Sequence, residues 1–173
     1  MSFVQHEHFK QFWPAEAVPA TGNLFLLIDA AAQTSGLHRL RFILPAGERC
    51  SLFEDTPEQN LHDLAPWLIH IDPSYLQSDA FLQLLKIEYE TASLSWIWTP
   101  LNLKELQKTI QPFMQAQLKS GQEALVRIYD PPVLLRLIKT FTPEQEKKLM
   151  GQIQAWWLYD AHHQIRHIIK PLN

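Results

Sequence analysis

The sequence predicts a single compact α/β domain in which helices flank a mixed β-sheet. Short apolar runs of strand length alternate along the chain with longer amphipathic segments that begin at helix-capping residues. The chain has 173 residues, a usual length for one domain, and 46% hydrophobic and 19% charged residues, as in folded globular proteins. Two adjacent short strands late in the chain predict a hairpin, so we expect antiparallel pairs beside parallel ones.

The first half of the chain supplies the strands at the centre of the expected sheet. Residues 24–29 form a short apolar run, the pattern of a central strand covered on both faces. In the expected strand at 94–99, Trp96 and Trp98 lie two positions apart and should share one face. The other elements expected in this half are a short helix at 36–44, a strand at 49–53, a helix opened by the capping box Thr56-Pro57-Glu58-Gln59, a strand at 67–71 and a helix beginning at Ser78.

The second half supplies a hairpin and several capped helices. Residues 113–129 predict a β-hairpin, because apolar and polar residues alternate on the way to a Ser-Gly turn at 120–121. Asp130 precedes Pro131, so we expect it to cap a helix over 131–140. Also expected are a helix capped at Asn102, a helix opened by Thr142-Pro143-Glu144-Gln145 that stops at Gly151, and a last strand at 153–159.

These elements divide the chain into three parts. Residues 1–23 are expected to form an N-terminal extension, residues 24–160 the α/β domain, and residues 161–173 a polar and aliphatic C-terminal tail.

Charge and cysteine content argue against several classes of protein. The formal net charge of -3 argues against nucleic acid or an anionic membrane as a partner, because such surfaces need clustered Lys and Arg. The single Cys50 forms no internal disulfide and is expected in the core. No signal-peptide pattern begins the sequence, and no apolar run reaches the length of a membrane span. We therefore expect a cytoplasmic protein.

Common catalytic motifs do not occur in the sequence. It has neither a glycine-rich phosphate-binding loop nor the Gly-x-Ser-x-Gly element of α/β-hydrolases. His163 and His167 lie four residues apart and would share a helix face beside His162 and Asp160, which is half of a zinc site. A solvated terminal segment explains the same residues, and we favour it. We expect no catalytic residue, no cofactor and no bound metal.

The corner at residues 127–131 concentrates polar residues beside the core. Arg127, Tyr129 and Asp130 stand where a strand gives way to a helix. A partly buried guanidinium needs a carboxylate partner, and Asp29 at the end of the first strand is our first choice. We expect this corner to be a structural and recognition node rather than an active site.

Five segments occur in an order that identifies a family. They are residues 26–31, in which an apolar strand ends at Asp29; Ser51-Leu52-Phe53-Glu54 with Leu64-Ala65-Pro66-Trp67-Leu68; the tryptophan strand and helix at 95–106; Val126-Arg127-Ile128-Tyr129-Asp130-Pro131-Pro132-Val133-Leu134; and Gly151-Gln152-Ile153 before Trp156 and Trp157. In order and spacing, this set resembles the DUF4123 family of adaptor chaperones, which load toxic effectors onto the type VI secretion spike. Val126, Pro132 and Gln152 depart from the family pattern, and Pro132 removes the second arginine of a two-arginine site.

The resemblance implies a non-catalytic adaptor. Its partners would be the N-terminal region of a secreted effector and a VgrG or PAAR spike protein, with no nucleic acid and no membrane involved. Such an adaptor needs an apolar, aromatic contact surface, so we expect some of Phe53, Trp67, Trp96, Trp98 and Trp156 to remain partly exposed. The candidate partner-binding or structural residues are Asp29, Phe53, Pro66, Trp67, Trp96, Trp98, Arg127, Tyr129, Asp130, Pro131, Gly151 and Trp156.

Two other functions fit parts of the sequence. One is an immunity protein that caps a toxin. The other is a hydrolase or metal-dependent enzyme that uses Asp29, Arg127 and the group His162, His163 and His167.

Overall fold

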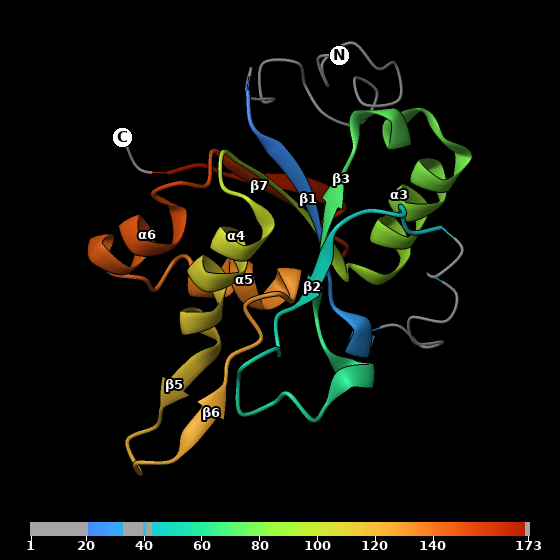
Figure 1. Cartoon of the computed structure of the whole chain (residues 1–173). Coiled ribbons are helices and arrows are strands. Elements are labelled where there is room, and N and C mark those ends of the chain that lie inside the picture. Colours follow the sequence, from blue (N-terminus) through green and yellow to red (C-terminus); the bar gives the residue numbers. More distant parts are fainter. Residues whose placement is uncertain (1–20, 33–39, 41–42, 172–173) are drawn as a thin grey trace.

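A six-stranded sheet forms the centre of the molecule, and Figure 1 shows it passing between two groups of helices. The computed structural model describes residues 21–32, 40 and 43–171. The sheet consists, in spatial order, of β2 (Arg49–Ser51), β3 (Trp67–Ile71), β1 (Asn23–Ile28), β4 (Leu94–Thr99), β7 (Ala155–Asp160) and β8 (Ile165–Ile169). The predicted α/β class and single compact domain are confirmed.

Every neighbouring pair in this sheet is antiparallel, so the parallel pairs that we expected do not form. The chain does make a strand–helix–strand crossover from β3 through α3 (Asp79–Thr91) to β4. Those two strands run in the same direction, but β1 lies between them and is antiparallel to both. A crossover pattern in the sequence does not say which strands become neighbours, and the insertion of β1 accounts for the difference.

The two faces of the sheet have separate hydrophobic cores. Phe25 and Leu27 of β1 point to one core, and Leu24, Leu26 and Ile28 point to the other. Both side-chain sets of this central strand are therefore buried, as its uninterrupted apolar run predicts.

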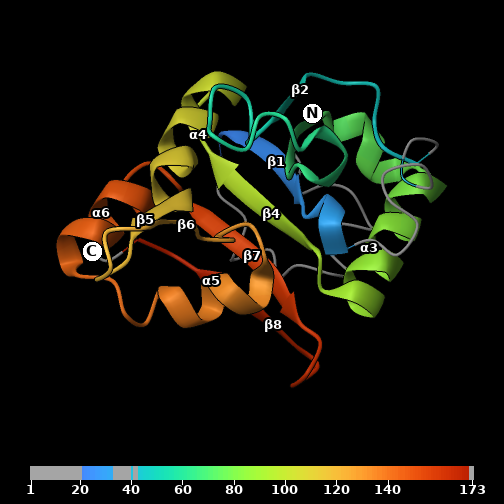
Figure 2. The same cartoon turned by 90° about the horizontal axis from the view of Figure 1, so that it is seen from below.

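Helices cover both faces, as the view in Figure 2 makes clear. On one face lie α3 and the 3-10 helix η5 (Pro73–Gln77). On the other face lie α4 (Leu103–Ile110), the 3-10 helix η6 (Gln111–Met114), α5 (Pro131–Leu137) and α6 (Pro143–Met150).

Several tryptophans are core residues with aromatic or polar partners. Trp96 packs edge-on against Phe81 of α3 with ring centroids 5.6 Å apart, and Trp98 packs edge-on against Trp157 at 6.1 Å. On the opposite face, the indole N–H of Trp156 donates to the Ser95 hydroxyl at 2.9 Å. The tryptophan content of the chain thus serves largely to fill the two cores.

Three of the predicted helix starts are confirmed by side-chain caps. Ser78 caps α3, while Asn102 and Thr142 each form a reciprocal capping box at the start of α4 and α6. The helix predicted after Thr56 is wrong. The Thr56 backbone N–H already donates to the Phe53 carbonyl at 3.2 Å, so it is unavailable to Gln59. Residues 52–60 form turns with a bend at Thr56, before the short 3-10 helix η4 (His62–Leu64).

The late hairpin is confirmed but is shorter than predicted. Strands β5 (Gln115–Gln117) and β6 (Glu123–Leu125) pair antiparallel, and Gly121 takes a positive φ of 84° in their connection. The hairpin extends away from the rest of the molecule in Figure 1. Residues 126–130 are not strand; they turn tightly, with the Asp130 amide donating to the Arg127 carbonyl at 3.0 Å.

The expected C-terminal tail is instead part of the sheet. Strand β8 pairs with β7 along five residues, and Arg166 of β8 forms an ion pair with the buried Glu88 of α3. Residues 163 and 167 therefore do not share a helix.

Most of the expected N-terminal extension and of the helix at 36–44 lies outside the described residues. Within the described residues, no helix combines the length and apolar character needed to cross a membrane.

Candidate functional site

The predicted polar corner forms around the end of strand β1. Asp29 directly follows β1 and is 1% exposed, and its carboxylate accepts a hydrogen bond from Arg127. Its other oxygen accepts from the Ala31 amide at 3.1 Å. The predicted pairing of Arg127 with Asp29 is thereby confirmed, and it joins the central strand to the turn that precedes α5.

Asp130 completes the corner differently from our prediction. It occupies the N-cap position of α5, and Pro131 and Pro132 begin the helix, but its carboxylate forms no capping hydrogen bond. The nearer charged partner is Arg127, whose guanidinium nitrogen lies 3.5 Å from an Asp130 oxygen. Burial raises the pKa of Asp130, against the attraction of Arg127. Arg127 thus bridges two carboxylates, and α5 is held at its start through this bridge.

Aromatic packing closes the corner on the core side. Tyr129 is 3% exposed, packs edge-on against Phe53 with centroids 6.1 Å apart, and lies under the Arg127 guanidinium at 5.9 Å. Burial raises the pKa of Tyr129 to about 12, so its phenol stays protonated at neutral pH.

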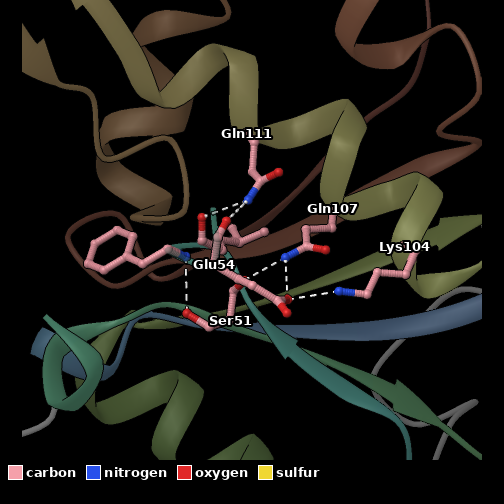
Figure 3. A network of polar contacts seen from close by, with 7 residues as sticks. Ser51, Glu54, Lys104, Gln107 and Gln111 are labelled. Atoms are coloured by element: carbon pink, nitrogen blue, oxygen red, sulfur yellow. Dashed lines mark hydrogen bonds and ion pairs between the residues drawn. The ribbon is translucent and has the colours of Figure 1, made fainter. Parts of the chain in front are cut away.

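The Ser51–Glu54 segment is fixed by side chains of α4 and of Gln111, the first residue of η6, as Figure 3 shows. Gln107, which is 4% exposed, donates to the Ser51 carbonyl at 2.7 Å and to the Glu54 carboxylate at 3.1 Å. Gln111 donates to the backbone carbonyl of Glu54 at 2.7 Å, and Lys104 pairs with its carboxylate at 2.8 Å. These contacts hold the segment that carries Phe53, and Phe53 packs against Tyr129 of the corner. Sequence reasoning missed Gln107 and Gln111.

The expectation of an exposed aromatic surface is wrong for most of the residues considered. Phe53, Trp96, Trp98 and Trp156 are at most 2% exposed, and only Trp67 is partly exposed. The sheet also separates Trp96 and Trp98 from Trp156, since they belong to opposite cores. These side chains stabilise the fold and do not form a contact surface.

The remaining candidates have structural positions. Pro66 is buried, and its carbonyl accepts from the Leu52 amide at 2.9 Å. Gly151 ends α6 with helical torsions, and a Cβ there would lie 2.5 Å from the Lys147 carbonyl oxygen. Cys50 is buried as expected, and burial raises the pKa of its thiol to about 11, which keeps it protonated and unreactive.

A groove lies between α5 and β8. Its volume is about 930 Å³. Leu135 and Ile138 line the helix side, and Ile165 and Ile169 line the strand side. Figure 2 shows α5 lying beside β7 and β8 at this side of the sheet. Pro132, two residues beyond Asp130, also lines the groove, so the Arg127 corner sets the position of one groove wall.

Histidines gather at one end of this groove, around the turn between β7 and β8. The His163 Nδ1 lies 2.7 Å from an Asp160 carboxylate oxygen, and the His167 Nε2 lies 3.6 Å from the same oxygen. The Asp160 carboxylate also accepts from the amides of His162 and His163. The contact with His163 lowers the pKa of Asp160 to about 2.

This cluster is distinct from the Arg127 corner. Asp29 follows β1 and Asp160 ends β7, and β4 lies between those strands. Two strand spacings, roughly 10 Å, therefore separate them. In the described part of the chain, no three His, Cys, Asp or Glu side chains converge as a metal site would require. The arrangement does not join Asp29, Arg127 and the histidines into one reaction centre.

We expect the purified protein to hold no stoichiometric zinc, because within the described residues no three His, Cys, Asp or Glu side chains are arranged to hold a metal ion, and the Asp160 carboxylate is taken up by His163 and by two backbone amides. Elemental analysis of the purified chain measures this. One zinc per chain that disappears in the His163→Ala, His167→Ala double variant would contradict it.

Strand β8 is the element of this site that sequence reasoning missed. Its signal was present, because Ile165, His167 and Ile169 alternate with Arg166 and Ile168 at the spacing of a strand. The two alternating sets lie on opposite faces, with Ile169 packed on one core and Arg166 paired to Glu88 beside the other.

The fold and the site together define an α/β protein with a built structural corner and an open groove along a sheet edge. The chain belongs to the DUF4123 family, described as a domain of unknown function, whose model matches residues 24–148. The match ends within α6, so β7 and β8 lie beyond it. No curated protein and no solved structure matches the chain.

Proposed function

We propose that this protein is a cytoplasmic, non-catalytic adaptor chaperone. It binds the N-terminal region of a type VI secretion effector and helps to load that effector onto a VgrG or PAAR spike protein. Membership of the DUF4123 family supports this proposal, together with the resemblance of the ordered motifs to those of the adaptor chaperones.

The observation that carries the proposal is the groove between α5 and β8. It is open to solvent along a sheet edge and has apolar side chains on both walls. A groove beside a strand edge fits a polypeptide segment, because the strand offers backbone groups and the walls offer pockets for side chains. An adaptor must release its cargo, and an open groove with a charged rim favours a contact of modest size.

The polar corner has a supporting part in this function. Arg127 links β1 to the start of α5 through Asp29 and Asp130, and α5 is one wall of the groove. The corner thus acts on binding through the position of the helix, without contacting cargo.

Co-expression tests the proposal. A tagged full chain is expressed with the N-terminal region of the effector encoded beside it, and the eluate is analysed by size-exclusion chromatography. We expect the two chains to elute as one complex. The matched control replaces the effector's N-terminal region with its C-terminal toxic region, which an adaptor leaves unbound. A complex with the toxic region alone would indicate an immunity protein, and no complex with either region would contradict both functions.

A further inference from the structure

Strand β8 presents an apolar edge to solvent. It is the last strand in the sheet order, with β7 on one side and no described strand on the other. Ile165 is 49% exposed and Ile168 is 36% exposed. Proteins usually protect such an edge with charges, prolines or a covering element, because unpaired backbone groups and apolar side chains attract another strand. A partner that pairs with β8 would satisfy both.

The groove beside this strand is positively charged in a protein whose formal net charge is -3. Arg136, Lys139 and Lys170 line it, and Asp160 is its one carboxylate. Asp160 is engaged by His163 and by two backbone amides. Among the described residues, none of the three cations lies within ion-pair distance of a carboxylate. The Arg136 Nε donates to the Pro132 carbonyl at 3.0 Å, which leaves its terminal guanidinium nitrogens, with Lys139 and Lys170, to meet carboxylates from outside.

We propose that the groove receives an extended acidic segment of a partner protein, which adds a strand to the free edge of β8. The groove-facing side of the segment carries both kinds of side chain: apolar ones pack against Ile165 and the α5 wall, and carboxylates face Arg136, Lys139 and Lys170. The proposal depends on the proposed function at one point, which is that the bound segment belongs to the effector.

A second copy of this chain fits the groove poorly. Pairing β8 with β8 would bring two grooves together, each with three lysine or arginine side chains and one engaged carboxylate. Like charges placed opposite one another oppose association. The charge of the groove therefore favours an acidic partner over a homodimer.

Fluorescence anisotropy of the full chain with three labelled nonapeptides tests the proposal. The first peptide repeats Glu-Glu-Val-Val, so that each face of the strand carries both kinds of side chain. The second replaces each acidic residue with Lys, and the third is the acidic peptide N-methylated at alternate residues. We expect the acidic peptide to bind about tenfold more tightly than the lysine peptide. N-methylation removes donors on one edge of the peptide and should weaken binding by a similar factor.

Variants of the full chain place the binding in the groove. Lys139→Glu with Lys170→Glu should weaken the acidic peptide about tenfold, because two attractive charges become repulsive. Lys119→Glu on the hairpin changes charge outside the groove and should leave binding unchanged. Ile165→Asp is matched by Leu118→Asp, since the two side chains are 49% and 50% exposed, and only Ile165→Asp should weaken binding.

Equal binding of the acidic and lysine peptides would overturn the proposal, as would equal effects of the groove and hairpin variants. A dimer in sedimentation analysis that Ile165→Asp dissociates would overturn it in favour of a second copy. The result of the peptide-binding experiment can be distinguished from the result of co-expression with the effector. A chain that binds its effector equally well with and without the groove substitutions keeps the adaptor function and loses this binding site.

Discussion

The pairing of Arg127 with Asp29 shows how far single residues could be predicted from the sequence. A carboxylate at the end of a buried strand and an arginine beside a core each need a partner, which made the pair predictable. The direction of the Asp130 side chain was not predictable. Its position favours capping α5, yet the carboxylate lies 3.5 Å from Arg127 and makes no capping bond. Only the assembled corner decides between these two partners.

Loss of the Arg127 guanidinium should destabilise the protein. Arg127→Ala leaves the Asp29 carboxylate buried without its charged partner, and we expect the free energy of unfolding to fall by about 1–2 kcal/mol. The Arg127 side chain is 43% exposed, and water limits the loss to this range. Urea denaturation measures it, with the exposed Arg49→Ala as a control expected within about 0.5 kcal/mol of the parent. Equal stability of the two variants would contradict a structural role for the corner.

The buried Glu88 should make stability depend on pH. Burial raises its pKa to about 7, despite the opposing attraction of Arg166. The folded state therefore holds this proton more tightly than the unfolded state, and the stability it contributes at low pH is lost as the pH rises from about 4.5 to about 7. Glu88→Gln should remove this part of the pH dependence of unfolding. Glu90→Gln, on the same helix and exposed, should keep it, and identical pH profiles for both variants would contradict the assignment.

At the scale of elements, two identical tetrapeptides have different structures. Thr142-Pro143-Glu144-Gln145 opens α6 with a capping box, but Thr56-Pro57-Glu58-Gln59 forms turns. The neighbours explain the difference. Gln111 holds the chain just before Thr56 through the Glu54 carbonyl, and the Glu58 carboxylate accepts from Gln115 at the start of the hairpin. A local pattern predicts a helix start, and distant contacts decide whether the helix forms.

The two threonines should respond differently to the same substitution. Thr142→Ala removes the side-chain acceptor for the Gln145 amide and should cost about 1 kcal/mol of unfolding free energy. Thr56→Ala removes a hydroxyl that donates to the Phe53 carbonyl at 2.9 Å and accepts from the Glu58 amide at 3.3 Å. These contacts lie within one turn and start no helix, so we expect a smaller loss than for Thr142→Ala. Thermal melts of both variants measure the difference. A larger loss for Thr56→Ala would show that the turn, and not the capped helix, is the more important element.

At the scale of the whole molecule, the sequence predicted the arrangement of the elements least completely. The α/β class, the central buried strand and the late hairpin were predictable, because each follows from a local pattern of apolar residues. The neighbours of each strand were not, and neither was the edge position of β8. The groove also escaped prediction, because its two walls, α5 and β8, are separated by α6 and β7 in the sequence. The aromatic residues expected at a contact surface are needed to fill two cores instead.

Reconstitution with the spike tests the central claim most directly. An immobilised VgrG or PAAR protein is incubated with the effector's N-terminal region, with and without the full chain, and the retained effector is quantified. The adaptor account predicts that the effector region is retained only when this chain is present. It also predicts that Lys139→Glu with Lys170→Glu lowers retention while Lys119→Glu does not. Equal retention of the effector region without this chain would contradict the claim that the protein is an adaptor.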